Sequence, residues 1–96
     1  MDTQFSKLQE TAKSIRKSII QSLVSSGSGH TGGSLGLTDL FTALYFQVLN
    51  HKPDNPAWKK RDRLILSIGH VAPVLYATLA HAGYFPVEEL LTLRKL

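Results

Sequence analysis

The chain has 96 residues, of which 43% are hydrophobic and 19% charged, so it is long enough for one small domain and too apolar for a disordered tail. It has no cysteine, no apolar run long enough to span a membrane and no cleavable export signal, so disulfides and thiolate metal sites are excluded and a cytoplasmic protein is expected. The net charge of +4 is spread over several groups of lysine and arginine, which favours solvated helix faces over a nucleic-acid-binding surface.

The first predicted element is a long amphipathic helix over residues 3–25. Apolar residues recur there at steps of three and four, which is the spacing of one helical face, and the basic residues lie off this stripe. Its members are Leu8, Ala12, Ile15, Ile19 and Leu23. Small residues and Gly27 then replace the periodic pattern, which predicts the end of the helix.

The stretch "SGSGHTGGSLG", residues 26–36, holds five glycines around His30. Gly27, Gly29 and Gly32 match the spacing of a dinucleotide-binding fingerprint, but that fingerprint follows a strand and this stretch follows a helix. We therefore interpret it as a loop in which glycine lets a ligand come close to the backbone.

A second helix is predicted from Leu37 to Val48, where the spacing of three and four returns. The stretch "NHKPDNPAW", residues 50–58, has the prolines and asparagines of a loop. An unbroken apolar run, Leu64-Ile65-Leu66, follows and predicts one buried strand of the parallel type, from about Arg63 to Ser67.

Gly69 and His70 follow this predicted strand, and Pro73 suits the first turn of a third helix that ends at Gly83. Pro86 is expected to open a fourth helix. The predicted fold class is therefore α/β, mostly helical with one strand. Because a parallel strand needs neighbours, and because the pattern stops without a capping signal, we expect residues 1–96 to be a partial domain, truncated at its C-terminus.

His30 and His70 each lie in a glycine-flanked loop and are the candidate functional residues. Each could instead be a turn residue whose ring is satisfied by neighbouring groups. A histidine near a helix N-terminus favours its neutral form, which can donate one hydrogen bond and accept another. His51 and His81 are expected to be structural, and no metal site is predicted, because no His, Asp or Glu residues combine ligand spacing with a glycine loop.

Three stretches resemble the N-terminal part of transketolases, most closely the N-terminal subunit of the two-chain kind. They are "SGHTGGSLGLTDLFTALYF" at residues 28–46, "NPAWKKRDRLILSIGHVAPVLYATLAHAGYF" at 55–85 and "ELLTLRKL" at 89–96. The sequence departs from the usual pattern at Thr31, at Lys59-Lys60, and at Ile68 and Val71 beside His70, but neither histidine is altered.

The resemblance implies a transferase that moves a two-carbon ketol unit between sugar phosphates, in the pentose phosphate pathway, with thiamine diphosphate and Mg²⁺ as cofactors. It implies that His30 is a catalytic residue that also contacts the substrate. It implies that His70 contacts both the donor sugar and the diphosphate side of the cofactor. A neutral imidazole at either position would suit proton transfer.

The family's Gly-Asp-Gly metal motif is absent, and so are its third active-site histidine and the glutamate that activates the cofactor. The resemblance therefore implies partners, namely the rest of the cofactor domain and a pyrimidine-binding domain or subunit, without which the chain should be inactive. Two alternatives remain: a non-catalytic module or truncated remnant that binds other subunits, and a small basic protein that binds nucleic acid.

Overall fold

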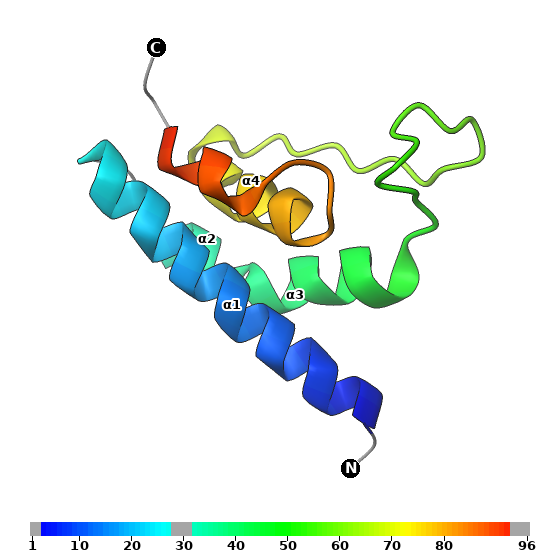
Figure 1. Cartoon of the computed structure of the whole chain (residues 1–96), viewed down its shortest axis with the longest axis horizontal. Coiled ribbons are helices and arrows are strands. Elements are labelled where there is room, and N and C mark those ends of the chain that lie inside the picture. Colours follow the sequence, from blue (N-terminus) through cyan, green and yellow to red (C-terminus); the bar gives the residue numbers. More distant parts are fainter. Residues whose placement is uncertain (1–2, 28–31, 93–96) are drawn as a thin grey trace.

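The structure is a computed structural model that describes residues 3–27 and 32–92 of the chain. Helices of different lengths follow one another, and the long first helix lies across the others (Figure 1). The elements in chain order are α1 (Thr3–Ser26), α2 (Gly32–Gly36), α3 (Thr38–Ala43), the π-helical turn η1 (Leu44–Val48), the 3-10 turn η2 (Gly69–Val71), α4 (Ala72–His81) and the 3-10 helix η3 (Val87–Thr92).

The long amphipathic helix is confirmed as α1 (Thr3–Ser26). Its predicted stripe faces the interior: Ile15 and Ile19 are fully buried, and Ala12 and Leu23 nearly so. The helix ends because Gly27 takes a φ of +76°, a left-handed conformation that favours glycine, and its N–H donates to the carbonyl of Leu23 at 3.0 Å.

The second helical region begins earlier than predicted, at Gly32, and is interrupted at Leu37, between α2 and α3. Its last turn, η1, has the wider π-helical form, and the N–H of Leu49 closes it by donating to the carbonyl of Leu44 at 2.7 Å. Arg16 of α1 pairs with Asp39 in the first turn of α3 at 3.0 Å, which joins the two helices at the surface.

The third helix is confirmed as α4 (Ala72–His81), and the predicted glycine at its end forms the hydrogen bonds of a helix cap. Gly83 has a φ of +102°, its N–H donates to the carbonyl of Ala80, and the N–H of Tyr84 donates to the carbonyl of Leu79, both at 3.0 Å. This pair of bonds is the Schellman arrangement, which satisfies carbonyls that the end of a helix leaves unpaired. The fourth predicted helix is present only as the short η3.

The predicted strand is wrong: no strand is present in residues 3–27 and 32–92, and the stretch from Arg63 to Ser67 is an irregular connection into η2. Leu64 and Leu66 pack against the core, whereas Ile65 is 91% exposed, so the stretch is covered on one side only. A strand is defined by a ladder of hydrogen bonds to a neighbour, and the described part of the chain provides no neighbour. The described part is therefore mostly helical, not α/β.

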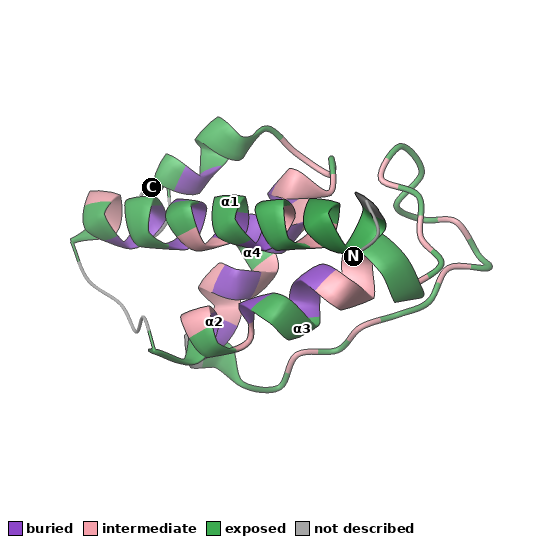
Figure 2. Ribbon diagram, turned by 90° about the horizontal axis from the view of Figure 1, so that it is seen from below, coloured by how far each residue is buried: buried purple, intermediate pink, exposed green. Residues whose placement is uncertain are grey.

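The core lies where α1, α3, α4 and η3 meet, and the buried faces of α1 and α4 turn toward each other (Figure 2). Its buried members are Ile15, Ile19, Leu23, Phe41, Val71, Val74, Ala77, Ala80 and Leu90. Within the described residues, no helix is long and apolar enough to cross a membrane.

Candidate functional site

The two candidate histidines differ in what the structure describes. The backbone of His70 lies in η2, directly before α4. His30 lies outside the described residues, as do all residues from 28 to 31. The described residues next to the two histidines are those of α2, which begins at Gly32, and of η2.

Gly33 of α2 packs directly against Val71, the residue after His70. A β-carbon at position 33 would lie 2.6 Å from Cγ1 of Val71, closer than such atoms approach in real proteins. The neighbouring Gly32 and Gly36 would meet nothing within 4 Å. Close packing thus requires glycine at position 33 specifically.

Ser34 makes a second contact between the same two segments. Its side chain is completely buried, and its hydroxyl donates to the backbone carbonyl of Val71 at 3.3 Å. A hydroxyl in this setting would otherwise be left without a partner, so the contact fixes the backbone of η2 against α2. The segment that follows His30 and the segment that contains His70 therefore lie side by side, although 37 residues separate Ser34 from Val71.

His81, which the sequence analysis set aside as structural, lies between α1 and α4. Its Nε2 is 2.7 Å from the hydroxyl of Ser18, and burial lowers the pKa of the ring below its ordinary value of 6.5. Ser18 lies beside the apolar stripe of α1, where nothing in the sequence marks it as a partner for histidine.

His51, the other histidine expected to be structural, forms a hydrogen bond at each of its two ring nitrogens. Its Nε2 lies 2.5 Å from the carbonyl of Tyr45 and its Nδ1 lies 2.6 Å from the hydroxyl of Tyr84. A carbonyl can only accept, so Nε2 carries the proton, and in the neutral ring Nδ1 accepts from Tyr84. The ring of His51 also stacks on that of Tyr84, with centroids 5.6 Å apart. His51 thus joins η1 to the chain that follows α4.

A comparison with protein families matches residues 7–96 to the thiamine diphosphate binding domain of transketolase. The match covers nearly the whole chain, so the chain belongs to this family. The resemblance noted from the three sequence stretches is thereby confirmed.

Individual relatives agree with this assignment. The 6-deoxy-6-sulfo-D-fructose transketolase subunit SqwG of Clostridium sp. is 47% identical over 95 residues, which is 99% of this chain and 34% of that protein. The transketolase of Mus musculus is 40% identical over 89 residues, 93% of this chain and 14% of that protein. Transketolase 1 of Escherichia coli is 38% identical over 92 residues, 95% and 14% respectively. The chain thus spans about a third or less of the length of these relatives.

The family is a thiamine diphosphate binding domain, which implies a bound cofactor. No group of three or more His, Cys, Asp or Glu side chains within residues 3–27 and 32–92 is placed to hold a metal ion. Pockets lie along α1, against α4 and η3, against α3, against η1 and against η3 alone.

Proposed function

We propose that this chain supplies one wall of a transketolase active site, in which a two-carbon ketol unit is transferred between sugar phosphates. The observation that supports the proposal is the packing of Gly33 and Ser34 against Val71, since it places α2, the helix that follows His30 in the sequence, against η2, which contains His70. Two histidines held in glycine-containing segments can converge on one hydroxylated ligand.

In this proposal His30 is the catalytic residue, contacts the substrate near its reacting hydroxyls and moves protons there. His70 contacts the donor sugar and the diphosphate side of the cofactor. Thiamine diphosphate would supply the stabilised carbanion that such transfers need. The metal ion, Mg²⁺ in the proposal, would be bound by residues outside this chain.

The proposal requires partners. One relative is named as a transketolase subunit, and this chain spans 34% of it. We propose that the rest of the cofactor domain and a pyrimidine-binding domain or subunit complete an oligomeric enzyme, that it works in the cytoplasm in the pentose phosphate pathway, and that neither nucleic acid nor membrane is a partner. The isolated chain should be inactive with thiamine diphosphate and Mg²⁺.

A chimera tests the roles of the histidines. This chain replaces the matching segment of the Clostridium subunit, which is assembled with the remaining components of that enzyme and assayed for ketol transfer from a ketose phosphate and from 6-deoxy-6-sulfo-D-fructose. Ketol transfer by the chimera, with kcat about 100-fold lower for His30→Ala, is the expected result, since positioned proton transfer contributes on that scale. His70→Ala is expected to raise KM for the donor and to weaken cofactor binding.

The matched control is His81→Gln, which changes a histidine bonded to Ser18 between α1 and α4 and should alter kcat by no more than about twofold. An equal loss of ketol-transfer activity in all three variants, with each variant still folded, would contradict the assigned roles. So would full activity of His30→Ala.

A specific observation favours the second candidate, a non-catalytic module that binds another subunit. Large apolar side chains are exposed at Val24, Val48 and Ile65, the last at 91%. If light scattering shows a subunit complex whose formation needs these side chains, while the chimera lacks ketol transfer, this candidate replaces the first. An active chimera excludes it.

A further inference from the structure

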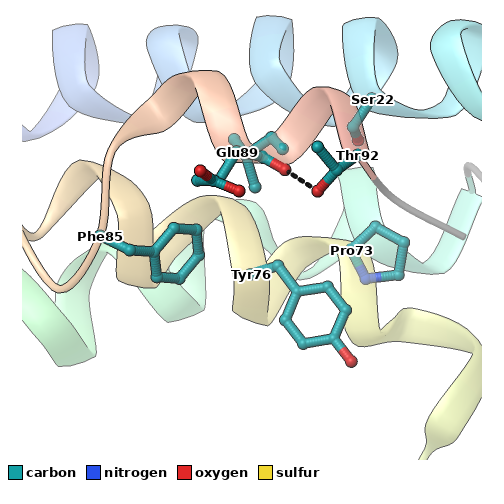
Figure 3. A pocket seen from close by; sticks show the side chains of 7 residues that line it. Ser22, Pro73, Tyr76, Phe85, Glu89 and Thr92 are labelled. Atoms are coloured by element: carbon teal, nitrogen blue, oxygen red, sulfur yellow. Dashed lines mark hydrogen bonds between the residues drawn. The ribbon is translucent and has the colours of Figure 1, made fainter. Parts of the chain in front are cut away.

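A pocket of about 350 Å³ lies between α1, α4 and η3, on elements other than α2 and η2. Glu89 and Thr92 of η3 lie on one side of it, and Pro73 and Tyr76 of α4 face them, with Phe85 at one end (Figure 3). The remaining lining residues are Ser22 of α1 and Leu90 of η3, both buried.

Two of the three hydroxyl groups that line this pocket, those of Ser22 and Thr92, already use their protons within the chain, and the third belongs to Tyr76. Ser22 donates to the carbonyl of Ile19 at 2.9 Å, and Thr92 donates to the carbonyl of Glu89 at 2.6 Å. A hydroxyl has one proton and two lone pairs, so each oxygen can only accept a further hydrogen bond. Ser22, Thr92 and the carboxylate of Glu89 therefore offer acceptors, and the Tyr76 hydroxyl can either donate or accept, so a ligand rich in donors suits this lining.

The pocket also carries one negative charge. Glu89 lines it and, in the part of the chain that the structure describes, forms no ion pair. The rings of Tyr76 and Phe85 and the ring of Pro73 supply flat apolar walls. Aromatic faces attract cations, and a planar cation can lie against such a face while it donates to a carboxylate.

We propose that this pocket binds an arginine side chain presented by another polypeptide chain. Guanidinium has five N–H donors, no acceptor, a positive charge and a flat face, and its aliphatic stem can cover apolar walls. The guanidinium group complements the pocket both in charge, opposite Glu89, and in hydrogen bonding, opposite the acceptor oxygens. A phosphate or carboxylate would be repelled by the charge of Glu89, so this site is distinct from the proposed sugar phosphate site and does not depend on it.

Three small probes test the proposal on the 96-residue chain: N-acetyl-arginine methylamide, its lysine analogue and its citrulline analogue, which keeps the shape of arginine without the charge. Amide resonances of α4 and η3 are followed by NMR during each titration. We expect saturable shifts with arginine, with a Kd in the range of about 1–10 mM, weaker binding of lysine and no saturation with citrulline.

Glu89→Gln should weaken arginine binding about fivefold or more, whereas the neighbouring Glu88→Gln, which does not line this pocket, should leave it unchanged. A second variant, Tyr76→Leu, changes an exposed side chain and should weaken the binding of the arginine probe more than that of the lysine probe. Equal binding of citrulline, equal effects of the two glutamate variants, or no saturation by arginine up to about 50 mM would overturn the proposal.

Discussion

At position 33 the hydrogen atom of glycine occupies the space that a β-carbon would need, 2.6 Å from Cγ1 of Val71. The backbone of Gly33 does not have a positive φ, so packing and not backbone conformation requires glycine here. The neighbouring Ser34 donates to the carbonyl of Val71, so two consecutive residues hold η2 in place. At the scale of single residues, this contact determines how α2 and η2 are placed against each other.

Gly33→Ala should therefore destabilise the chain by about 1–3 kcal/mol, because the added methyl group must displace Val71 or the backbone of α2. Urea unfolding followed by circular dichroism measures the change. Gly32→Ala in the same helix meets nothing within 4 Å and should be neutral or slightly stabilising. In a Val71→Ala background the cost of Gly33→Ala should shrink, and an unchanged cost would mean that the two side chains do not conflict.

At the scale of elements, α1 and α4 are joined by more than their apolar stripes. Ser18 and Ser22 of α1 are buried together with Ile15 and Ile19, which widens the buried face beyond the predicted stripe. Ser18 contacts His81 at 2.7 Å, whereas Ser22 donates to its own helix. The packing of these two helices thus includes a titratable ring whose pKa is lowered by burial.

This ring predicts a pH dependence of stability. The unfolded chain binds the proton of His81 near the ordinary pKa of 6.5, whereas the folded chain binds it more weakly. The free energy of unfolding is therefore highest, as far as His81 is concerned, above about pH 6.5. It falls as the pH drops below that value, and the fall levels off once the pH is below the lowered pKa of the folded chain. Urea midpoints measured between about pH 7.5 and pH 5 should fall less in His81→Gln than in the unmodified chain. If the two chains lose stability in parallel, protonation of His81 does not oppose folding.

At the scale of the whole molecule, one core connects elements from both ends of the described chain. Ile15 and Ile19 of α1 meet Phe41 of α3, Val74 of α4 and Leu90 of η3 in a single cluster. A chain of this length with one core is expected to unfold in one cooperative step. Removing a side chain from the cluster should therefore affect all helices together.

Ile15→Ala should cost about 2–5 kcal/mol, since it removes a fully buried side chain and leaves a cavity. Ile20→Ala on the exposed side of the same helix, where the side chain is 48% exposed, should change stability by about 0.5 kcal/mol or less. Hydrogen exchange should show protection falling in α1 and α4 alike for Ile15→Ala. A loss of hydrogen-exchange protection that is confined to α1 would contradict a single core.

The sequence alone predicted α1 and α4 and the glycines that end them, Gly27 and Gly83. These features are local: the spacing of apolar residues defines a helical face, and only glycine readily adopts the positive φ at a helix end. The sequence also identified the family through its motifs, and the match over residues 7–96 confirms it. The roles of His30 and His70 stay predictions.

Only the tertiary structure decided which residues contact each other across the fold where the local sequence pattern does not predict the contact. The apolar run around Ile65 predicted a strand, but a strand depends on a neighbour, and in the described residues this stretch packs one side on helices and leaves the other exposed. Ser18 carries no pattern that marks it, and the glycine-rich stretch that contains Gly33 and Ser34 does not reveal their contact with Val71. The partners are distant in sequence: His81 for Ser18, and Val71 for Ser34 and Gly33. The formation of a helix depends on residues that are close together in the sequence, so the sequence predicts it. Close packing depends on which helix surfaces meet in the folded chain, so only the tertiary structure shows it.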